Sequence, residues 1–245
     1  IRFFDIRLVH DNGVLKLCHA SHTFNTTFVG DVLKTTVEFL KEHPSETVIM
    51  TIKRDDDKDH DGGTKYRFAL TKALEGDRAL TPYMVKSFRS DFTLGDLRGK
   101  MLIISRDGWI MTPSGQVTKW PDNASFTSSI KSTDEDIRPT TLHVDHYKSW
   151  GSEKVNYVAQ NVRKAQAAFS SSQNDWFITF TSTAGGAFFG LGIPQNTTRE
   201  IDPHVNNILR GNENFRTSGI LVFNFAGWWD DMLTKTVIRL NHTKP

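Results

Sequence analysis

Charged and polar side chains that can act on an anion stand where several predicted strands end. They are Asp5, Arg7, His19, Lys53, Arg106 and Asn224. Because catalytic groups of a parallel barrel lie at the C-terminal ends of its strands, we expect these side chains to converge at one rim. Arginine and lysine suit an anionic substrate, a phosphate in particular, and histidine can move a proton near neutral pH. Each residue taken singly is also compatible with a surface ion pair, so the argument depends on their convergence.

Short apolar runs alternate with amphipathic patterns along the chain, which predicts βαβ units around a parallel sheet. The expected strands cover residues 1–9, 14–19, 47–52, 101–105, 176–181 and 219–225. The expected helices cover residues 31–42, 64–75, 153–170, 200–210 and 230–240. Residues 107–150 are polar and rich in Ser and Thr, and a long irregular loop is expected there. A single (β/α) barrel over residues 1–245 fits this order best. The alternative is a doubly wound open sheet, although no Gly-rich βα turn of the dinucleotide-binding kind follows any strand.

The composition is that of a globular protein with no affinity for nucleic acid. The formal net charge of the 245 residues is +2, and no basic stripe is visible. The 17 Phe and 6 Trp residues exclude a disordered chain. The single cysteine, Cys18, excludes an internal disulfide. No run approaches the roughly 18 apolar residues of a membrane span, and no signal-peptide pattern is present.

Motifs spread over the whole chain point to one family. They are Ile-Arg-Phe-Phe-Asp-Ile-Arg at 1–7, Leu-Cys-His-Ala at 17–20, and the runs 39–53, 95–100, 120–123, 145–147, 180–186 and 237–239. In this order they resemble the X-domain of phosphatidylinositol-specific phospholipase C in its bacterial, single-domain form. The resemblance implies a distorted TIM barrel that cleaves the phosphodiester of free or glycosylated phosphatidylinositol. The inositol 2-hydroxyl would attack phosphorus, and diacylglycerol and a cyclic inositol phosphate would be released.

The resemblance also implies roles for individual residues. His19 matches the general acid that protonates the leaving glycerol oxygen, Arg7 the arginine that stabilises phosphoryl charge, and Asp5 an orienting carboxylate. The inositol-binding positions are matched by Lys53, Arg106, Asp145 and Tyr147, and a loop that contacts the membrane is matched by Phe188 and Phe189. A metal-dependent branch of the family places calcium ligands near the position of Arg7, so an arginine there implies metal-independent catalysis.

Three departures from the family pattern stand out. The general base of the family, a His followed by Asp, lies upstream of the 1–7 motif, and none of the nine histidines here has a matching context. We therefore expect that the first barrel strand and the base precede this sequence, and that the chain alone is inactive. Asn224 stands where the family usually has an Asp that hydrogen-bonds the base. Ala20 replaces a Gly, a mild change if its φ is negative.

Two alternative functions remain open from the sequence. One is a non-catalytic remnant of the same fold that binds inositol phosphates or membranes. The other is a barrel phosphodiesterase that acts through a metal held by carboxylates, a chemistry that Arg7 does not favour.

The remaining motifs concern calcium, membranes and secretion. The run 57–62 matches the first half of a calcium loop, so Asp57, Asp59 and Asp61 form a weak candidate calcium site. The alternative is a solvated acidic loop, because Phe68 stands at the twelfth position, where a calcium loop has Glu. Trp228 and Trp229 lie beside glycine and are weaker candidates for membrane contact than the Phe pair, and Trp229 is expected to pack in the core under the final helix. Asn-x-Ser/Thr sequons occur at Asn25, Asn123, Asn196 and Asn241. Together with the resemblance they favour a secreted glycoprotein that is peripheral on membranes and has a phosphoinositide lipid as its partner.

Overall fold

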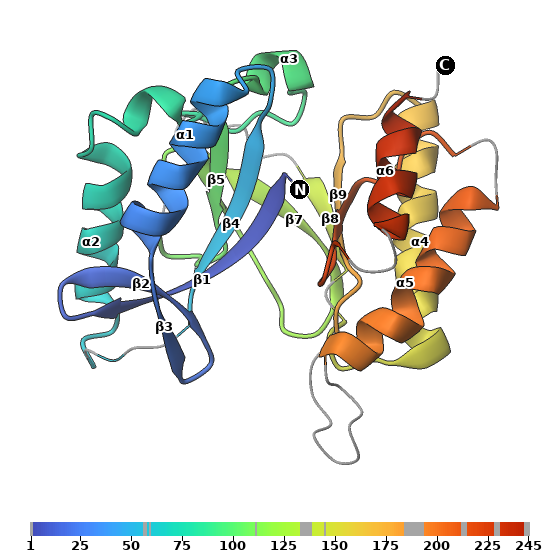
Figure 1. Ribbon diagram of the computed structural model, residues 1–245, viewed down its shortest axis with the longest axis horizontal. Helices are drawn as coiled ribbons and strands as arrows, with labels where there is room; N and C mark the ends of the chain where they lie inside the picture. Colours follow the sequence, from blue (N-terminus) through green and yellow to red (C-terminus); the bar gives the residue numbers. More distant parts are fainter. Residues whose placement is uncertain are drawn as a thin grey trace. The chain divides into compact units, whose positions relative to one another are not determined.

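A computed structural model shows a mixed α/β chain, as the sequence predicts (Figure 1). It describes residues 2–55, 58, 60–110, 112–132, 139–144, 146–183, 194–211, 215–227 and 231–242. Backbone contacts divide the chain into two compact units. The N-terminal unit contains Arg2–Trp120 and Ser129–Arg138, and the C-terminal unit contains Pro121–Ser128 and Pro139–Pro245. The expectation of one domain over 1–245 stays a prediction.

The strands of the N-terminal unit form a mixed sheet in the order β6-β5-β4-β1-β2-β3. They are β1 (Phe3–Asp11), β2 (Val14–His19), β3 (His22–Thr27), β4 (Val48–Arg54), β5 (Met101–Ser105) and β6 (Gly115–Val117). β1 pairs in parallel with β4, β4 with β5 and β5 with β6, while β1, β2 and β3 form an antiparallel meander. The last residues of β7 (Ser125–Lys131) pair with β6.

Helices cover this sheet through one apolar cluster. A π-helical turn, Phe28–Leu33, leads into α1 (Lys34–Glu42), and α2 (Thr64–Glu75) follows β4. Leu40 from α1 and Leu70 from α2 join Met50 of β4 in the same buried cluster. Shorter turns follow, a 3₁₀ turn at Thr81–Tyr83 and α3 (Leu94–Leu97) with a capping box of Thr93 and Asp96. The register of β1 on β4 matters most for function, because it pairs Asp5 with Thr51 and Arg7 with Lys53.

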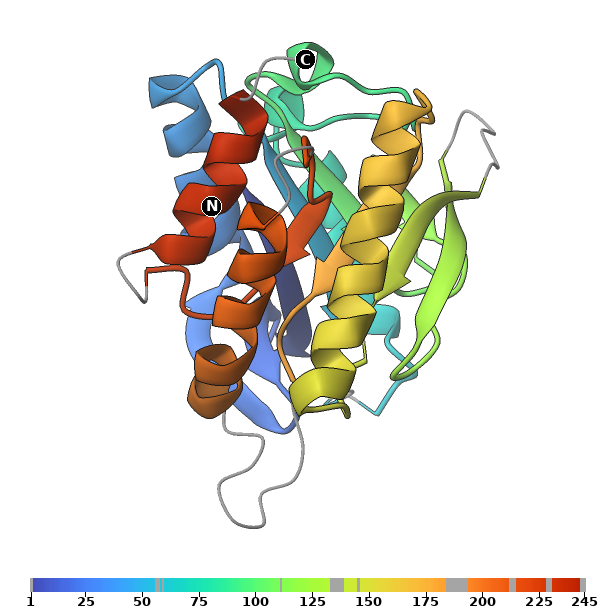
Figure 2. The ribbon, with the colours of Figure 1, turned by 90° about the vertical axis from the view of Figure 1, so that its right-hand side faces the viewer.

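The C-terminal unit is a parallel sheet packed against three helices. Its strands are β8 (Pro139–Val144), β9 (Trp176–Phe180) and β10 (Ile220–Val222), in the order β10-β9-β8. Its helices are α4 (Gly151–Ser170), α5 (Pro194–Arg210) and α6 (Met232–His242). They lie side by side in Figure 2, with α5 in contact with both α4 and α6. Val158, Val205 and Leu240 belong to the buried cluster that joins them. In the described part of the chain no strand pairing closes a ring.

The irregular loop expected over residues 107–150 is the clearest error of the sequence reading, since β6, β7 and β8 lie there. Hydroxyl groups explain how such a polar stretch is buried. Thr112 donates from Oγ1 to the carbonyls of Ile103 at 2.5 Å and Gly115 at 2.6 Å, and Ser114 donates to the carbonyl of Val85 at 2.8 Å. These internal hydrogen bonds replace water, so a hydrophilic composition is compatible with buried strands.

The start of α5 was also predicted too late, at residue 200 instead of Pro194. Proline suits a first helical turn because its missing N–H would have no intrahelical partner there. The hydroxyls of Thr197 and Thr198 donate to the carbonyl of Pro194 at 3.0 and 2.8 Å.

None of the described helices combines the length and the apolar character needed to cross a bilayer.

Candidate active site

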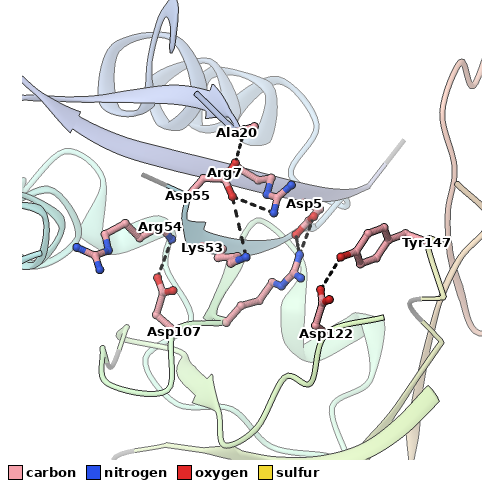
Figure 3. A network of polar contacts seen from close by, with 10 residues as sticks. Asp5, Arg7, Ala20, Lys53, Arg54, Asp55, Asp107, Asp122 and Tyr147 are labelled. Carbon is pink, nitrogen blue, oxygen red and sulfur yellow. Dashed lines mark hydrogen bonds and ion pairs between the residues drawn. The ribbon is translucent and has the colours of Figure 1, made fainter. Parts of the chain in front are cut away.

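Parallel pairing of β1, β4 and β5 brings together four of the charged residues that the sequence singled out, although Asp5 and Arg7 lie inside β1 and not at its end (Figure 3). β1 carries Asp5 and Arg7, β4 carries Lys53, and Arg106 follows β5 directly. Two carboxylates form ion pairs with the three cations, since Asp5 pairs with Arg106 and Asp55 with Arg7 and Lys53. The expected convergence of all six predicted side chains at one rim stays a prediction.

Asp5 and Arg106 form a nearly buried ion pair. Nη1 of Arg106 lies 2.8 Å from both carboxylate oxygens of Asp5, and Thr51 donates from Oγ1 to Asp5 at 2.7 Å. The side chain of Arg106 is 8% exposed and that of Asp5 20%. The indole of Trp120 covers the guanidinium, with Cζ of Arg106 3.8 Å from the ring centroid. An arginine held by a carboxylate and by an aromatic face is restricted in orientation, which suits recognition of a polar ligand.

Asp55, which the sequence reading did not select, is the second linking carboxylate. Its Oδ1 lies 2.9 Å from Nη2 of Arg7 and 4.0 Å from Nζ of Lys53. Its Oδ2 accepts a hydrogen bond from the backbone N–H of Ala20 at 2.7 Å. The Asp55 side chain is 7% exposed, whereas 30% of Arg7 and 37% of Lys53 remain accessible. One buried carboxylate therefore holds two accessible cations and the turn that follows β2.

His19 stands at this turn, as the last residue of β2. It is exposed, and its cross-strand neighbour is His22 of β3. Ala20, the next residue, has a φ of +51°, in the left-handed region that favours glycine. The change from glycine at this position is therefore not mild, since the condition of a negative φ is not met. The hydrogen bond from Ala20 to Asp55 helps to hold the strained residue in place.

A further carboxylate, Asp107, fixes the loop behind Arg106. Its Oδ2 accepts the backbone N–H of Arg54 at 2.8 Å, and this bond ties the residue after Arg106 to the last residue of β4. Burial raises the pKa of Asp107 above its usual value. The guanidinium of Arg54 lies over Trp109, with Cζ 5.2 Å from the ring centroid.

The remaining predicted site residues belong to the C-terminal unit. Tyr147 donates from its hydroxyl to Oδ1 of Asp122 at 2.6 Å, and this hydrogen bond raises the pKa of the phenol. Nζ of Lys148 lies 3.3 Å from the other oxygen of Asp122. Asn224 is half-buried and follows β10. The other three predicted residues lie outside the described residues, and they are Asp145, Phe188 and Phe189.

The candidate calcium loop is described only in part. Asp57 and Asp59 lie outside the described residues, as do Trp228 and Trp229. Asp61 caps α2 instead, since its two oxygens accept the backbone N–H groups of Gly63 at 2.8 Å and Lys65 at 3.0 Å. Within the part of the chain that is described, no group of three or more His, Cys, Asp or Glu side chains is arranged to hold a metal ion.

Chemically, the cluster in the N-terminal unit suits an anionic substrate. Arg7 and Lys53 offer accessible positive charge, and a preformed cation can stabilise charge that develops on phosphoryl oxygens. His19 lies one residue from the bond that fixes this cluster and can transfer a proton. The signal that would have revealed Asp55 is its position directly after the Lys53-Arg54 end of a buried strand, although the acidic run 55–57 reads as a solvated loop.

Two known proteins are similar to this chain in sequence. A 1-phosphatidylinositol phosphodiesterase of Listeria monocytogenes is 34% identical over 241 residues, covering 98% of this chain and 68% of the relative. The Staphylococcus aureus (strain Newman) protein of the same name is 24% identical over 246 residues, covering 97% of this chain and 76% of the relative. No family model matches this sequence.

Solved structures extend the comparison to the fold. A phosphatidylinositol-specific phospholipase C from Staphylococcus aureus, studied for the modulation of its membrane binding, has a TM-score of 0.82 at 22% identity over 97% of this chain and 79% of its own. The phosphatidylinositol-specific phospholipase C from Listeria monocytogenes has a TM-score of 0.71 at 21% identity, over 99% of this chain and 79% of its own. These likenesses confirm the predicted α/β fold of the distorted TIM-barrel type.

Proposed function

Since this chain belongs to the family of bacterial 1-phosphatidylinositol phosphodiesterases, the phosphatidylinositol-specific phospholipases C, we propose that it cleaves phosphatidylinositol. The oxygen of the inositol 2-hydroxyl forms a new bond to phosphorus while the bond from phosphorus to the glycerol oxygen breaks. The products are diacylglycerol and a cyclic inositol phosphate. The observation that most supports this reaction is that Asp55 holds Arg7, Lys53 and the turn after His19.

Arg7 is proposed to stabilise the phosphoryl group. Its Nη2 is engaged by Asp55, while the side chain remains 30% exposed. A guanidinium fixed on one side needs no reorganisation when negative charge grows on the oxygens in front of it. Because Arg7 already supplies a positive charge at this point, we propose that catalysis needs no metal.

His19 is proposed as the general acid. Its imidazolium gives a proton to the glycerol oxygen as that oxygen leaves, and the proton of the inositol 2-hydroxyl passes to a general base. Positioned proton transfer contributes typically ~10²–10⁴-fold to a rate. Asn224 is proposed to lie beside the base, where an amide provides hydrogen bonds without the charge of a carboxylate.

The inositol ring is proposed to bind through polar and aromatic groups. Lys53 and Arg106 donate hydrogen bonds to its hydroxyls, Asp145 accepts them, and Tyr147 lies on the ring face. Asp5 is a positioning residue that orients Arg106, to which it is 2.8 Å away.

The protein is proposed to act outside the cell as a peripheral enzyme on lipid surfaces. Phe188 and Phe189 are the proposed membrane contacts, since exposed aromatic side chains favour the bilayer interface. Replacing both with Ser is expected to lower binding to phosphatidylinositol-containing vesicles, while hydrolysis of a soluble inositol phosphodiester is retained. Equal vesicle binding would exclude this contact.

The central test measures product release from phosphatidylinositol in the presence of EDTA, with the complete protein product of the gene. Wild-type protein is expected to release a cyclic inositol phosphate, and His19→Ala to lose this activity by at least about a hundredfold. His22→Ala is the matched control, because it removes an imidazole from the opposite strand of the same meander. Unchanged activity in His19→Ala would contradict its role as the acid.

The same assay separates the alternatives. Binding of inositol phosphate without any turnover would indicate a non-catalytic remnant, for which the asparagine at position 224 is the one specific indication. Turnover that disappears with EDTA and returns with a divalent cation would indicate a metal-dependent phosphodiesterase.

A further inference from the structure

The C-terminal unit contains a pocket of about 340 Å³ that the proposed chemistry does not use. One wall is formed by residues 123–127, of which the last three begin β7. The other wall comes from α4, whose lining residues are three and four positions apart and so share one face of the helix. These residues are Tyr157, Gln160, Asn161 and Lys164.

The lining is polar and carries no negative charge. Gln160 and Lys164 are exposed on the helix side, and Ser125 and Thr127 are exposed on the strand side. Lys164 provides a positive charge, and the lining contains no Asp or Glu. Phe126 is also among the lining residues and adds apolar surface. Such a set offers donors and acceptors to hydroxyl groups and a single cation to an anion.

The aromatic end of the pocket is held rigidly. The rings of His146 and Tyr157 stack at a centroid distance of 3.8 Å and an interplanar angle of 9°. The carbonyl of His146 accepts hydrogen bonds from Nζ of Lys154 at 3.0 Å and from Oγ of Ser149 at 2.7 Å. Lys154 is buried, and its hydrogen bond fixes the backbone at His146.

Two amides fix the rest of the lining. Asn123 accepts the backbone N–H of Lys148 at its Oδ1 at 2.7 Å, and Asn161 donates from Nδ2 to Oγ1 of Thr179 at 2.8 Å. The framework is therefore preorganised, and the groups left to meet a ligand are those of Gln160, Lys164 and the two hydroxyl residues. Preorganisation lowers the entropy cost of binding.

We propose that this pocket binds a small phosphorylated polyol, such as a sugar phosphate. Its volume is near the lower end of ligand pockets, which run from about 300 to 1,000 Å³, and so suits one ring with its phosphate. Lys164 pairs with the phosphate, Gln160, Ser125 and Thr127 bond the hydroxyls, and the C–H face of the ring lies on the aromatic surface. The inference concerns a second site and does not depend on the proposed lipase activity.

The test is a titration of isotopically labelled protein with glucose 6-phosphate, followed by amide chemical shifts. We expect shifts at residues 123–127 and along 157–164. Lys164→Met is expected to weaken binding at least about tenfold, as for loss of a charge-assisted hydrogen bond. Arg163→Gln is the matched control, since Arg163 is an exposed cation next in sequence that does not line the pocket, and it is expected to bind normally.

Two further probes test the ligand class. Glucose is expected to bind more weakly than glucose 6-phosphate, and inorganic phosphate more weakly still. Gln160→Ala is expected to weaken the binding of glucose 6-phosphate and to leave the affinity for inorganic phosphate unchanged. Shifts that are absent from the pocket, or that persist undiminished in Lys164→Met, would overturn the site. Equal shifts with inorganic phosphate would overturn the assignment of a polyol.

Discussion

The ion pair of Asp5 and Arg106 gives a quantitative prediction about the stability of the N-terminal unit. Asp5→Asn keeps the size of the side chain and removes its charge, so that Arg106, 8% exposed, loses its carboxylate partner. A hydrogen bond to a charged group contributes about 1.5–3 kcal/mol, and breaking a wholly buried pair costs about 3–5 kcal/mol. Because one-fifth of Asp5 is exposed to water, we expect the free energy of unfolding to fall by about 2–3 kcal/mol.

The assay is urea unfolding at pH 7 followed by fluorescence, arranged as a double-mutant cycle with Arg106→Met. The coupling free energy between the two positions is expected to be about 1–3 kcal/mol. Asp11→Asn is the control on the same strand, since its ion pair with Lys16 at 2.9 Å is more exposed, and it should destabilise less. A change of under about 0.5 kcal/mol in Asp5→Asn, or a coupling near zero, would refute the reasoning.

Two other changes test conformation and titration. Ala20→Gly is expected to raise the free energy of unfolding by about 0.5–1 kcal/mol. The substitution removes the strain of a left-handed φ of +51°, and this gain exceeds the cost of the greater unfolded-state entropy of glycine. A variant that is less stable in urea unfolding would contradict the presence of strain. Asp202 is 4% exposed in α5, and burial raises its pKa to about 7 even though Thr181 donates a hydrogen bond to it at 3.3 Å. Because the folded state holds this proton more tightly than the unfolded state, the contribution of Asp202 to stability should be fully present below about pH 4 and should be lost, by up to about 4 kcal/mol, as pH rises through 7. Asp202→Asn should lack this part of the pH dependence, and identical urea midpoints across pH 4–8 in the two proteins would disprove it.

Strand ends were the most predictable part of the candidate site. Lys53 and Arg106 stand at the ends of buried apolar runs, and parallel pairing places such ends at one edge, whereas Asp5 and Arg7 lie inside β1, which continues to Asp11. The sequence pattern therefore predicts the positions of Lys53 and Arg106, whereas the full length of β1 was not predicted. The angle at which Trp120 covers Arg106 depends on a loop path that no local pattern determines, and so the stack was not foreseen.

Hydrogen bonds that reach far along the chain account for what the sequence did not predict. Asp55 acts through Ala20, 35 residues away, and an acidic run gives no sign of such a partner. Similarly, Thr112 and Ser114 are buried because their hydroxyls meet the carbonyls of Ile103 and Val85. A composition rich in Ser and Thr reads as solvent-exposed until those partners are known, which is why the strands in residues 107–150 were missed.

Both carboxylate oxygens of Asp55 make contacts, and this affects how the residues that they hold move relative to one another. One oxygen holds Arg7 and the other holds the turn beside His19, so thermal displacement of the meander carries both groups in the same direction. Their separation then varies less than the position of either one. If they have their proposed roles, the proton donor His19 and the phosphoryl-binding cation Arg7 would stay matched to one substrate geometry when the meander moves.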